Sequence, residues 1–268
     1  MELDPAESLA PADEPDLAVL DLGRSTKTSE LAARRLARWI IDEGIQVGTP
    51  LPPEKQMAER LGIGRGSMRE ALRMLETFGL VEIRTGRYGG PIVRIPDAGD
   101  LSVALTLGFY VKKISMLDVL DARIVLEPFL AELAAPRITP DQLVGLRATV
   151  EDMRRERASE ITYLRAAREF HDLVAEAAGQ PVLSHLSAGL HKIAGGESVG
   201  ISYSVRERLA TASAHEEIIE ALEAQDGVLA KTLWTKHLYS ARKYWTKRFP
   251  DNAAKPVEWT LGVHEGNA

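Results

Sequence analysis

A tight bend between two short amphipathic segments, Gly62-Ile63-Gly64, constrains the fold more than any other feature of this sequence. Glycine adopts left-handed backbone angles at little cost, so the chain can reverse within three residues here. Apolar residues recur at helical spacing on both sides of the bend, over residues 53–61 and 65–78. Those expected to point inward are Met57, Ala58, Leu61, Met68, Ala71, Leu72, Leu75 and Phe78. The pattern predicts two helices joined by a short turn.

The segments before and after this helix pair add a preceding helix and a following β-hairpin. Residues 25–43 carry apolar positions at helical spacing, and Pro53 suits the first turn of the next helix. After the helix pair, two β-type segments at 80–84 and 91–95 flank a glycine-rich turn. Helix, helix, turn, helix and hairpin together predict a winged helix-turn-helix domain over residues 23–95.

The second helix of the pair carries a stripe of cations. Arg65, Arg69 and Arg73 stand four residues apart, so they share one side of the helix, opposite its apolar side. A helix in the major groove of DNA reads bases and phosphates with such side chains, and arginine can donate two hydrogen bonds to guanine. The alternative is a solvated face of helical charge pairs, since Glu70 and Glu76 are close in sequence.

The distribution of charge supports contact with DNA. The chain has a net charge of −6, yet residues 23–95 hold 13 basic and 8 acidic side chains. Residues 1–22 hold seven acidic and no basic side chains, and residues 96–268 hold 20 basic and 24 acidic ones. A basic domain between acidic segments is typical of a chain whose nucleic-acid contact is confined to that domain. Residues 1–22, rich in Pro, Asp and Glu, are expected to form a disordered tail.

Several classes of protein are excluded by what the sequence lacks. No apolar run reaches the roughly 18 residues that a membrane span needs, and the first 22 residues do not resemble a secretion signal. The chain has no cysteine, so disulfides, thiolate metal sites and cysteine nucleophiles are excluded. A cytoplasmic protein without a membrane partner is expected.

The remainder of the chain is predicted to be entirely helical. Residues 96–100 form an expected linker, and residues 250–268 an expected loose C-terminal tail. Between them, over residues 101–249, helical patterns are separated by Gly- and Pro-containing loops. The predicted helices are 101–112, 115–135, 140–157, 160–178, 182–194, 205–224 and 226–248. The fold class is therefore mainly α: a winged helix-turn-helix followed by a bundle of about seven helices.

Three histidines fall on inward faces of three of these helices. His171, His215 and His237 each share a helical face with apolar residues. Three imidazoles that point into one bundle could converge on a divalent ion. The alternative for each is a hydrogen-bonded core histidine, because spacing alone does not show that the three meet.

Residues 30–95 strongly resemble the DNA-binding domain of the GntR family of bacterial transcription regulators. The matching words are Gly48-x-x-Leu51-Pro-x-Glu54, Met57-Ala58, Leu61-Gly62-Ile63-x-Arg65, Arg69-Glu70-Ala71-Leu72 and Gly79-Leu80-Val81. The resemblance covers residues 30–95. It implies DNA contacts at Lys55, Arg65 and Arg69, and in the wing at Gly86 and Arg87. Where the family often has Ser before the first arginine, this chain has Gly64.

The second half resembles the FCD ligand-sensing domain of the FadR subgroup of that family. The matching words are Asp121-x-Arg123-x-x-x-Glu127, Glu169-Phe170-His171, and a pair of histidines 22 residues apart, His215 and His237. Many such domains bind a metal through these three histidines and an Asp four residues before the first. In this chain that position is Ala167.

Two interpretations of this altered set remain open. In one, the histidines hold a weaker or more open metal site, and a carboxylate effector or water fills the gap. In the other, the site is metal-free and the histidines line a polar pocket. Without the anionic ligand, a bound ion is expected to be Zn or Ni rather than Mn or Mg, because those two accept imidazole readily.

The resemblance also implies an anchor for an acidic effector. Arg123 is expected to face the pocket and bind a carboxylate, with His191 and Lys192 as further candidates. The alternative for Arg123 is an ion pair with Asp121 or Glu127.

Together these features predict a ligand-responsive transcription regulator, most often a repressor in this family. A homodimer that reads a pseudo-palindromic operator in double-stranded DNA is expected, with a small organic or fatty acid as effector. One alternative is a metal-dependent hydrolase or lyase fused to a DNA-binding head. Another is an architectural DNA-binding protein with an inert dimerisation bundle.

Overall fold

A computed structural model describes residues 28–86, 89–155, 159–194 and 200–259. The chain divides into two compact units, one that ends at Ile95 and one that begins at Pro96. Two expectations, the acidic tail over residues 1–22 and the wing residue Arg87, lie outside the described residues. No helix within the described ranges is long and apolar enough to cross a membrane.

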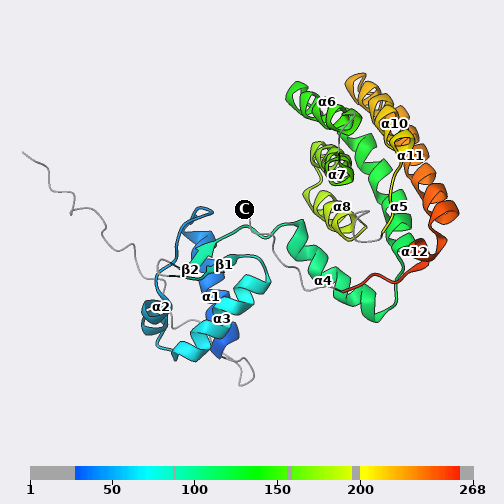
Figure 1. Cartoon of the computed structure of the whole chain (residues 1–268). Coiled ribbons are helices and arrows are strands. Elements are labelled where there is room, and N and C mark those ends of the chain that lie inside the picture. The colour runs from blue at the N-terminus through cyan, green and yellow to red at the C-terminus, as the bar shows by residue number, and fades with distance from the viewer. Residues whose placement is uncertain (1–27, 87–88, 156–158, 195–199, 260–268) are drawn as a thin grey trace, which may run out of the picture. The chain divides into compact units, whose positions relative to one another are not determined.

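The first unit has the order helix, helix, helix, hairpin (Figure 1). Its elements are α1 (Thr28–Asp42), α2 (Glu54–Leu61), α3 (Arg65–Thr77), β1 (Val81–Arg84) and β2 (Gly90–Val93). The two strands pair antiparallel, from Val81 opposite Val93 to Arg84 opposite Gly90. Its core includes Leu36, Ile40, Met57, Ala58, Met68, Ala71, Leu72, Leu75 and Val93.

The bend between α2 and α3 forms as the glycines predict. Gly62 has a φ of 64°, in the left-handed region, and its amide ends α2 by donating to carbonyls of the last turn. Gly64 is extended and stands at the N-cap of α3 without a side-chain cap. Phe78 differs from expectation, because it is 70% exposed rather than inward. The helix ends at Thr77 and Gly79 turns with a φ of 76°, so Phe78 leaves the buried face of α3.

The second unit is helical throughout its described residues. Its helices are α4 (Ala98–Val111), α5 (Met116–Ala134), α6 (Pro140–Arg154), α7 (Glu160–Ala177), α8 (Pro181–Ile193), α10 (Val205–Glu223), α11 (Gly227–Arg248) and α12 (Pro250–Ala254). Helix α5 is central, since it packs against α7, α8, α11 and α12 (Figure 1). The core is built from aliphatic and aromatic side chains such as Leu120, Phe170, Ile218 and Trp234.

Side-chain caps set where several of these helices begin. Ser115, Thr139 and Ser204 each accept a hydrogen bond from the third residue of their helix, whose side chain in turn bonds the backbone of the cap. Asp97 caps α4 in the same way, so the helix begins inside the expected 96–100 linker. These local motifs explain why most helix starts follow from sequence.

The segment after residue 249 differs from the loose tail that was expected, as far as Trp259. Residues Pro250–Ala254 form α12, and the Val257 amide donates to the Ile114 carbonyl at 2.8 Å. Val257 is buried in the core of the bundle. Burial of this apolar side chain, together with the backbone hydrogen bond, holds the segment against the start of α5.

Candidate functional site

The arginine stripe on α3 faces solvent in the first unit. Arg65, Arg69 and Arg73 are all exposed, while Met68 and Leu72 on the same helix are buried. The apolar side of α3 packs against the rest of the unit, so the cationic side is free to approach a ligand. This arrangement fits a recognition helix, because a helix in the major groove must present its polar side outward.

One of the three arginines is already paired within the unit. Arg69 forms a two-point ion pair with Glu54 at the start of α2, with Nε and Nη2 at 3.3 and 3.1 Å from the carboxylate oxygens. The contact joins the two helices of the helix-turn-helix, and sequence reasoning missed it. Lys55, exposed on α2, lies within 3.8 Å of Glu59 in a weak surface pair.

The wing is formed by the β1–β2 hairpin. Gly86 is exposed and has a φ of 107°, an angle that favours glycine. Its carbonyl accepts a hydrogen bond from the Gly89 amide at 3.0 Å, which closes the turn.

The second unit brings the three predicted histidines together. His171 on α7, His215 on α10 and His237 on α11 each offer a ring nitrogen, and these atoms all lie within 4.8 Å of one another. The Nε2 atom of His237 lies 3.3 Å from Nε2 of His171 and 3.4 Å from Nε2 of His215. We call these three residues the histidine cluster.

Two of the distances within the histidine cluster are of the size that a tetrahedral metal ion requires. Two nitrogen ligands at ~2.0–2.1 Å from zinc in tetrahedral geometry lie ~3.3–3.4 Å apart. The two distances to His237 match this edge. A single N–H of His237 can serve only one neighbouring ring, whereas an ion would accept the lone pairs of all three rings. The described residues therefore include a histidine set that can hold a metal ion.

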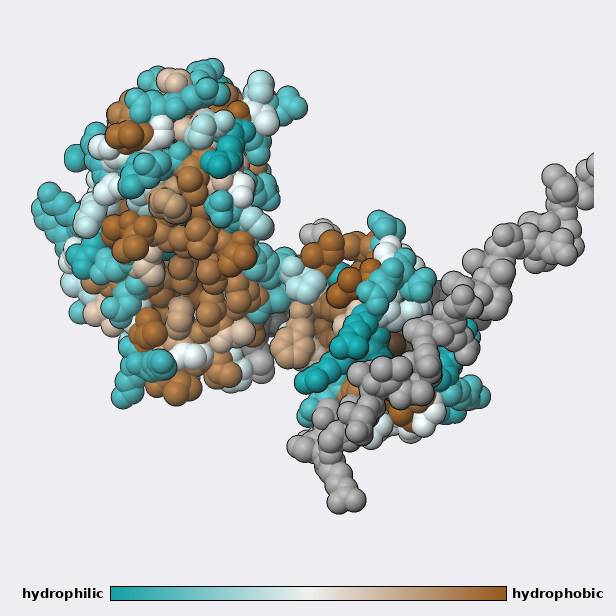
Figure 2. Space-filling model, turned by 180° about the vertical axis from the view of Figure 1, so that it is seen from behind, coloured by the Kyte–Doolittle hydropathy of each residue, from teal (hydrophilic) through white to brown (hydrophobic). Residues whose placement is uncertain are grey.

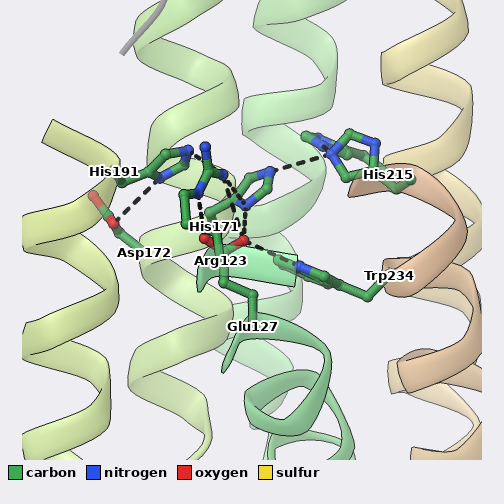
Figure 3. A network of polar contacts seen from close by, with 8 residues as sticks. Arg123, Glu127, His171, Asp172, His191, His215 and Trp234 are labelled. Atoms are coloured by element: carbon green, nitrogen blue, oxygen red, sulfur yellow. Dashed lines mark hydrogen bonds and ion pairs between the residues drawn. The ribbon is translucent and has the colours of Figure 1, made fainter. Parts of the chain in front are cut away.

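A buried carboxylate orients the first ring of the cluster (Figure 3). The Nδ1 atom of His171 lies 2.7 Å from a carboxylate oxygen of Glu127, which fixes the proton on Nδ1 and turns the Nε2 lone pair toward the other two rings. The Trp234 indole N–H donates to the same oxygen at 3.2 Å. A carboxylate behind a ligand histidine is a common outer-shell feature of metal sites.

Glu127 is held in its charged form by Arg123. The guanidinium Nε lies 2.6 Å from Glu127 Oε1, and both side chains are buried. Burial alone would raise the pKa of Glu127, but the Arg123 charge and the hydrogen bond with His171 outweigh burial and hold the pKa well below its ordinary value. The pairing of Arg123 with Glu127, which sequence left as the alternative to an effector contact, is the one present in the structure.

The remaining rings of this region are neutral in the folded protein. Burial lowers the pKa of His237 to about 3, with the neighbouring His171 acting in the same direction. Burial, followed by the proximity of His237, holds the pKa of His215 well below its ordinary value. His215 also stacks on Phe170, with ring centroids 3.8 Å apart. Neutral imidazole is the form that binds metal ions.

The other two effector candidates have partners of their own. His191 Nε2 lies 2.8 Å from Arg123 Nη2, and its Nδ1 faces Asp172 at 3.8 Å (Figure 3). Burial and the Arg123 charge lower the pKa of His191 to about 3, so this ring is neutral and accepts from Arg123. Lys192 lies at the surface, with Nζ 3.6 Å from the Asp97 carboxylate.

The histidine cluster forms part of the wall of a cavity of about 780 Å³. Side chains of α5, α7, α8, α10 and α11 line it, including Arg123, Arg165, Arg168, Ala167, His191, Lys192, Lys236, Glu207 and Glu217. Basic lining residues thus outnumber acidic ones. Lys236 and Glu217 offset each other at 3.6 Å, which leaves Arg165 and Arg168 as exposed cations of the wall.

Sequence reasoning named Glu127 only as a possible partner of Arg123, without its contact with His171, and missed Trp234 as part of the site. The spacing of Arg123 and Glu127 was a usable signal, since side chains four residues apart on a helix meet. No local signal identifies Trp234, because its indole reaches Glu127 across the packing of α11 on α5. Asp172 was missed for the same reason.

Both halves of the chain match known protein families. Residues 28–88 match the family described as bacterial regulatory proteins, gntR family, and residues 118–240 match the FCD domain. The two matches lie on the helix-turn-helix unit and on the helical unit that holds the histidine cluster.

Similar full-length proteins are named regulators. The Glc operon transcriptional activator of Escherichia coli K12 is 33% identical over 58% of this chain and 62% of the relative. The repressor NanR of Cronobacter sakazakii is 27% identical over 84% of this chain and 90% of the relative. The chain spans about half to two thirds of the length of several curated relatives that it matches.

A solved structure supports the same assignment. The Streptococcus agalactiae GntR structure is similar with a TM-score of 0.64 and 29% identity, over 80% of this chain and 99% of that one. The protein is thus a member of the gntR family of bacterial regulatory proteins, with an FCD domain behind its helix-turn-helix.

Proposed function

We propose that this protein is a transcription regulator whose affinity for operator DNA is set by a small carboxylic acid bound beside a metal ion. The observation that carries the proposal is the histidine cluster in the wall of a cavity with excess basic residues, in a chain that also presents an exposed arginine stripe. Its family comprises transcription regulators rather than enzymes.

The DNA contact is proposed to centre on α3. Arg65 and Arg73 are exposed and offer guanidinium groups to bases or phosphates of the major groove. Arg69 has a second task, because its ion pair with Glu54 fixes α3 against α2. Contacts to the phosphate backbone of the DNA, which set the register of the helix in the groove, are proposed for Lys55, Gly86 and Arg87.

Two copies of the chain are proposed to read a pseudo-palindromic operator, since one recognition helix covers too few base pairs for selective binding. Support for a homodimer comes from α4, which is mostly apolar and yet has no buried residue. Figure 2 shows apolar side chains gathered over one face of the helical unit. Exposed apolar residues of this unit include Leu107, Tyr110, Val111, Val125, Phe129, Val182 and Leu186. A second copy that covers such side chains would remove them from water.

The effector is proposed to be a small carboxylic acid. The cavity volume of about 780 Å³ lies within the range of small-molecule sites. A fatty acid needs a long apolar channel, whereas this wall mixes the histidines with arginines, hydroxyl groups and short alanines. Arg165 and Arg168 are available to hold the anion, while Arg123 is held by Glu127 and His191.

The metal ion is proposed to be Zn or Ni rather than Mn or Mg. Three imidazoles supply only nitrogen ligands, and Mn and Mg prefer carboxylate and water oxygens. The two distances to His237 are compatible with the tetrahedral geometry that zinc adopts in proteins.

Regulation is proposed to follow from differential binding. An acid that binds the helical unit with different affinity in two arrangements of the DNA-binding domains shifts the population between them. A coupling of about 1–3 kcal/mol is typical of such systems and is sufficient here. Repression is the expected mode, as the name of NanR indicates for that relative, and a regulator that binds operator DNA is expected in the cytoplasm.

The test is DNA binding by the purified protein to fragments that it selects from its own genome. The proposal expects retention of specific fragments by the wild-type protein and their loss in an Arg65→Ala/Arg73→Ala variant with unchanged thermal stability. It also expects at least one small carboxylic acid to alter the affinity for the selected fragment. Equal DNA affinity of the variant and the wild type would contradict the assignment of α3 as the recognition helix. If no acid changed the DNA affinity, the protein would instead be an architectural DNA-binding protein.

A further inference from the structure

We infer that the acidic stretch 13–16 of the N-terminal segment competes with DNA for the arginine stripe of α3, so that the chain restrains its own DNA binding. The inference rests on the proposed role of α3 and goes beyond it, because it assigns to the same helix face a second ligand from within the chain. The occupant is defined by its charge and by its distance along the chain from α1.

The first step is the state of the arginine stripe in the folded unit. Arg69 is held by the Glu54 carboxylate through two hydrogen bonds. Within the described part of the chain, by contrast, no hydrogen bond or ion pair holds the guanidinium of Arg65 or Arg73. Both side chains are exposed, and eight residues of α-helix separate their Cα atoms by ~12 Å along the axis. Helix α3 therefore presents two cations that no described residue pairs with.

The second step is the charge pattern of the N-terminal segment. Residues 1–22 hold seven acidic and no basic side chains, and three of the acids fall within four positions, at Asp13, Glu14 and Asp16. In an extended chain the ends of such a stretch lie ~10 Å apart, which matches the separation of the two guanidinium groups. Arginine binds carboxylates and phosphates with the same forked donors. The stretch therefore offers the stripe the same kind of contact as the DNA backbone.

The third step is the reach of the segment. Helix α1 begins at Thr28 and packs against α3. Thr28 lies twelve positions after Asp16, and a chain of that length spans at most ~40 Å. Helix α3 has 13 residues and is therefore only ~20 Å long. The acidic stretch can thus reach both arginines from the start of the neighbouring helix.

The strength of the competition follows from this tether. A ligand joined to its site by a short chain acts at an effective concentration of about 1 mM. A contact of a few exposed charges has a dissociation constant of about 0.1 mM, at the weak end of non-specific ionic binding to DNA. The ratio of these two values lowers the affinity for DNA about tenfold. Because the charges are exposed, salt screens the contact and reduces the effect.

The experiment measures DNA affinity of the full-length protein by fluorescence anisotropy, with a labelled fragment that the wild type retains from its own genome. We expect Asp13→Asn/Glu14→Gln/Asp16→Asn, the tail variant, to bind about tenfold more tightly than the wild type at about 0.05 M salt. At about 0.3 M salt the gain should fall below about twofold. The matched control is Glu151→Gln/Glu176→Gln/Glu220→Gln, which removes the same charge from exposed sites of the helical unit. It should gain far less than the tail variant at the lower salt concentration.

A synthetic peptide of residues 1–22 tests the contact itself. Added to the tail variant, the peptide should weaken DNA binding. In the absence of DNA, the labelled peptide should bind the tail variant and lose this binding when Arg65→Ala/Arg73→Ala are added.

A gain in the tail variant no larger than in the control would overturn the inference, and so would peptide binding that survives the loss of both arginines. Both results leave the role of α3 in DNA binding intact. Unchanged DNA affinity in Arg65→Ala/Arg73→Ala would instead contradict that role.

Discussion

The buried ion pair of Arg123 and Glu127 yields the sharpest prediction for the stability of the helical unit. In Glu127→Gln the shape of the side chain is kept and its charge is lost. The Arg123 guanidinium, 5% exposed, would then remain charged in the interior without its partner at 2.6 Å. Removal of one member of a buried ion pair costs about 3–5 kcal/mol, which we expect as the loss in free energy of unfolding at pH 7.

Urea denaturation of the full chain, followed by tryptophan fluorescence, measures this loss. Glu132→Gln is the matched control, because Glu132 also lies on α5 and pairs with Lys231 at 2.6 Å, but at the surface. The control should lose at most about 1 kcal/mol. Replacement of both partners, Arg123→Met with Glu127→Leu, should recover most of the stability, because no unpaired charge remains.

The pH dependence of this loss has a definite sign. The pKa of Glu127 is lowered on folding, so its stabilising contribution is present above its ordinary pKa and is lost as pH falls toward the lowered value in the folded protein. The difference between wild type and Glu127→Gln should therefore be largest near neutral pH and shrink in acid. Equal stability losses for Glu127→Gln and Glu132→Gln at pH 7 would refute the reasoning.

Three further predictions concern the two units separately. Arg65→Ala should weaken operator binding by about 1–3 kcal/mol, as measured by fluorescence anisotropy. The control Arg206→Ala, which removes an exposed arginine of α10, should leave operator affinity unchanged; a larger loss in the control than in Arg65→Ala would contradict the placement of α3 in the major groove. Gly62→Ala should destabilise the first unit by about 1–2 kcal/mol in thermal unfolding, because φ is 64° there. The pKa values of His191 and His237 are lowered to about 3 in the folded protein, so only the unfolded chain gains protons at these rings between about pH 6.5 and 3. The urea midpoint should therefore fall as the pH drops through this range, and a flat profile would argue against neutral rings in the folded protein.

The parts of the fold that were predictable from sequence are those set by local chemistry. The Gly62–Gly64 bend follows from backbone freedom, and the capped helix starts at Ser115 and Ser204 follow from capping motifs. The convergence of the histidine cluster was a hypothesis, because helical faces indicate inward direction but not which faces meet. The structure brings the three rings together.

The features that sequence did not reveal depend on contacts between distant segments. Glu54 meets Arg69 only because α2 and α3 fold against each other, and Trp234 reaches Glu127 only across two helices. The segment after Phe249 is packed where a loose tail was expected, because its prolines and acids conceal two buried apolar residues, Ala253 and Val257. Periodicity over a few residues cannot identify such an anchor.

The central claim is that the histidine cluster couples a small acid to operator binding. It is tested most directly by the change in operator affinity that a responsive acid causes in zinc-loaded protein, compared between the wild type and His237→Ala. We choose His237 because it is the least buried of the three histidines, so its removal disturbs the core least. A change of about 5–150-fold in the wild type and none in the variant is predicted. The same change in both proteins would contradict the claim.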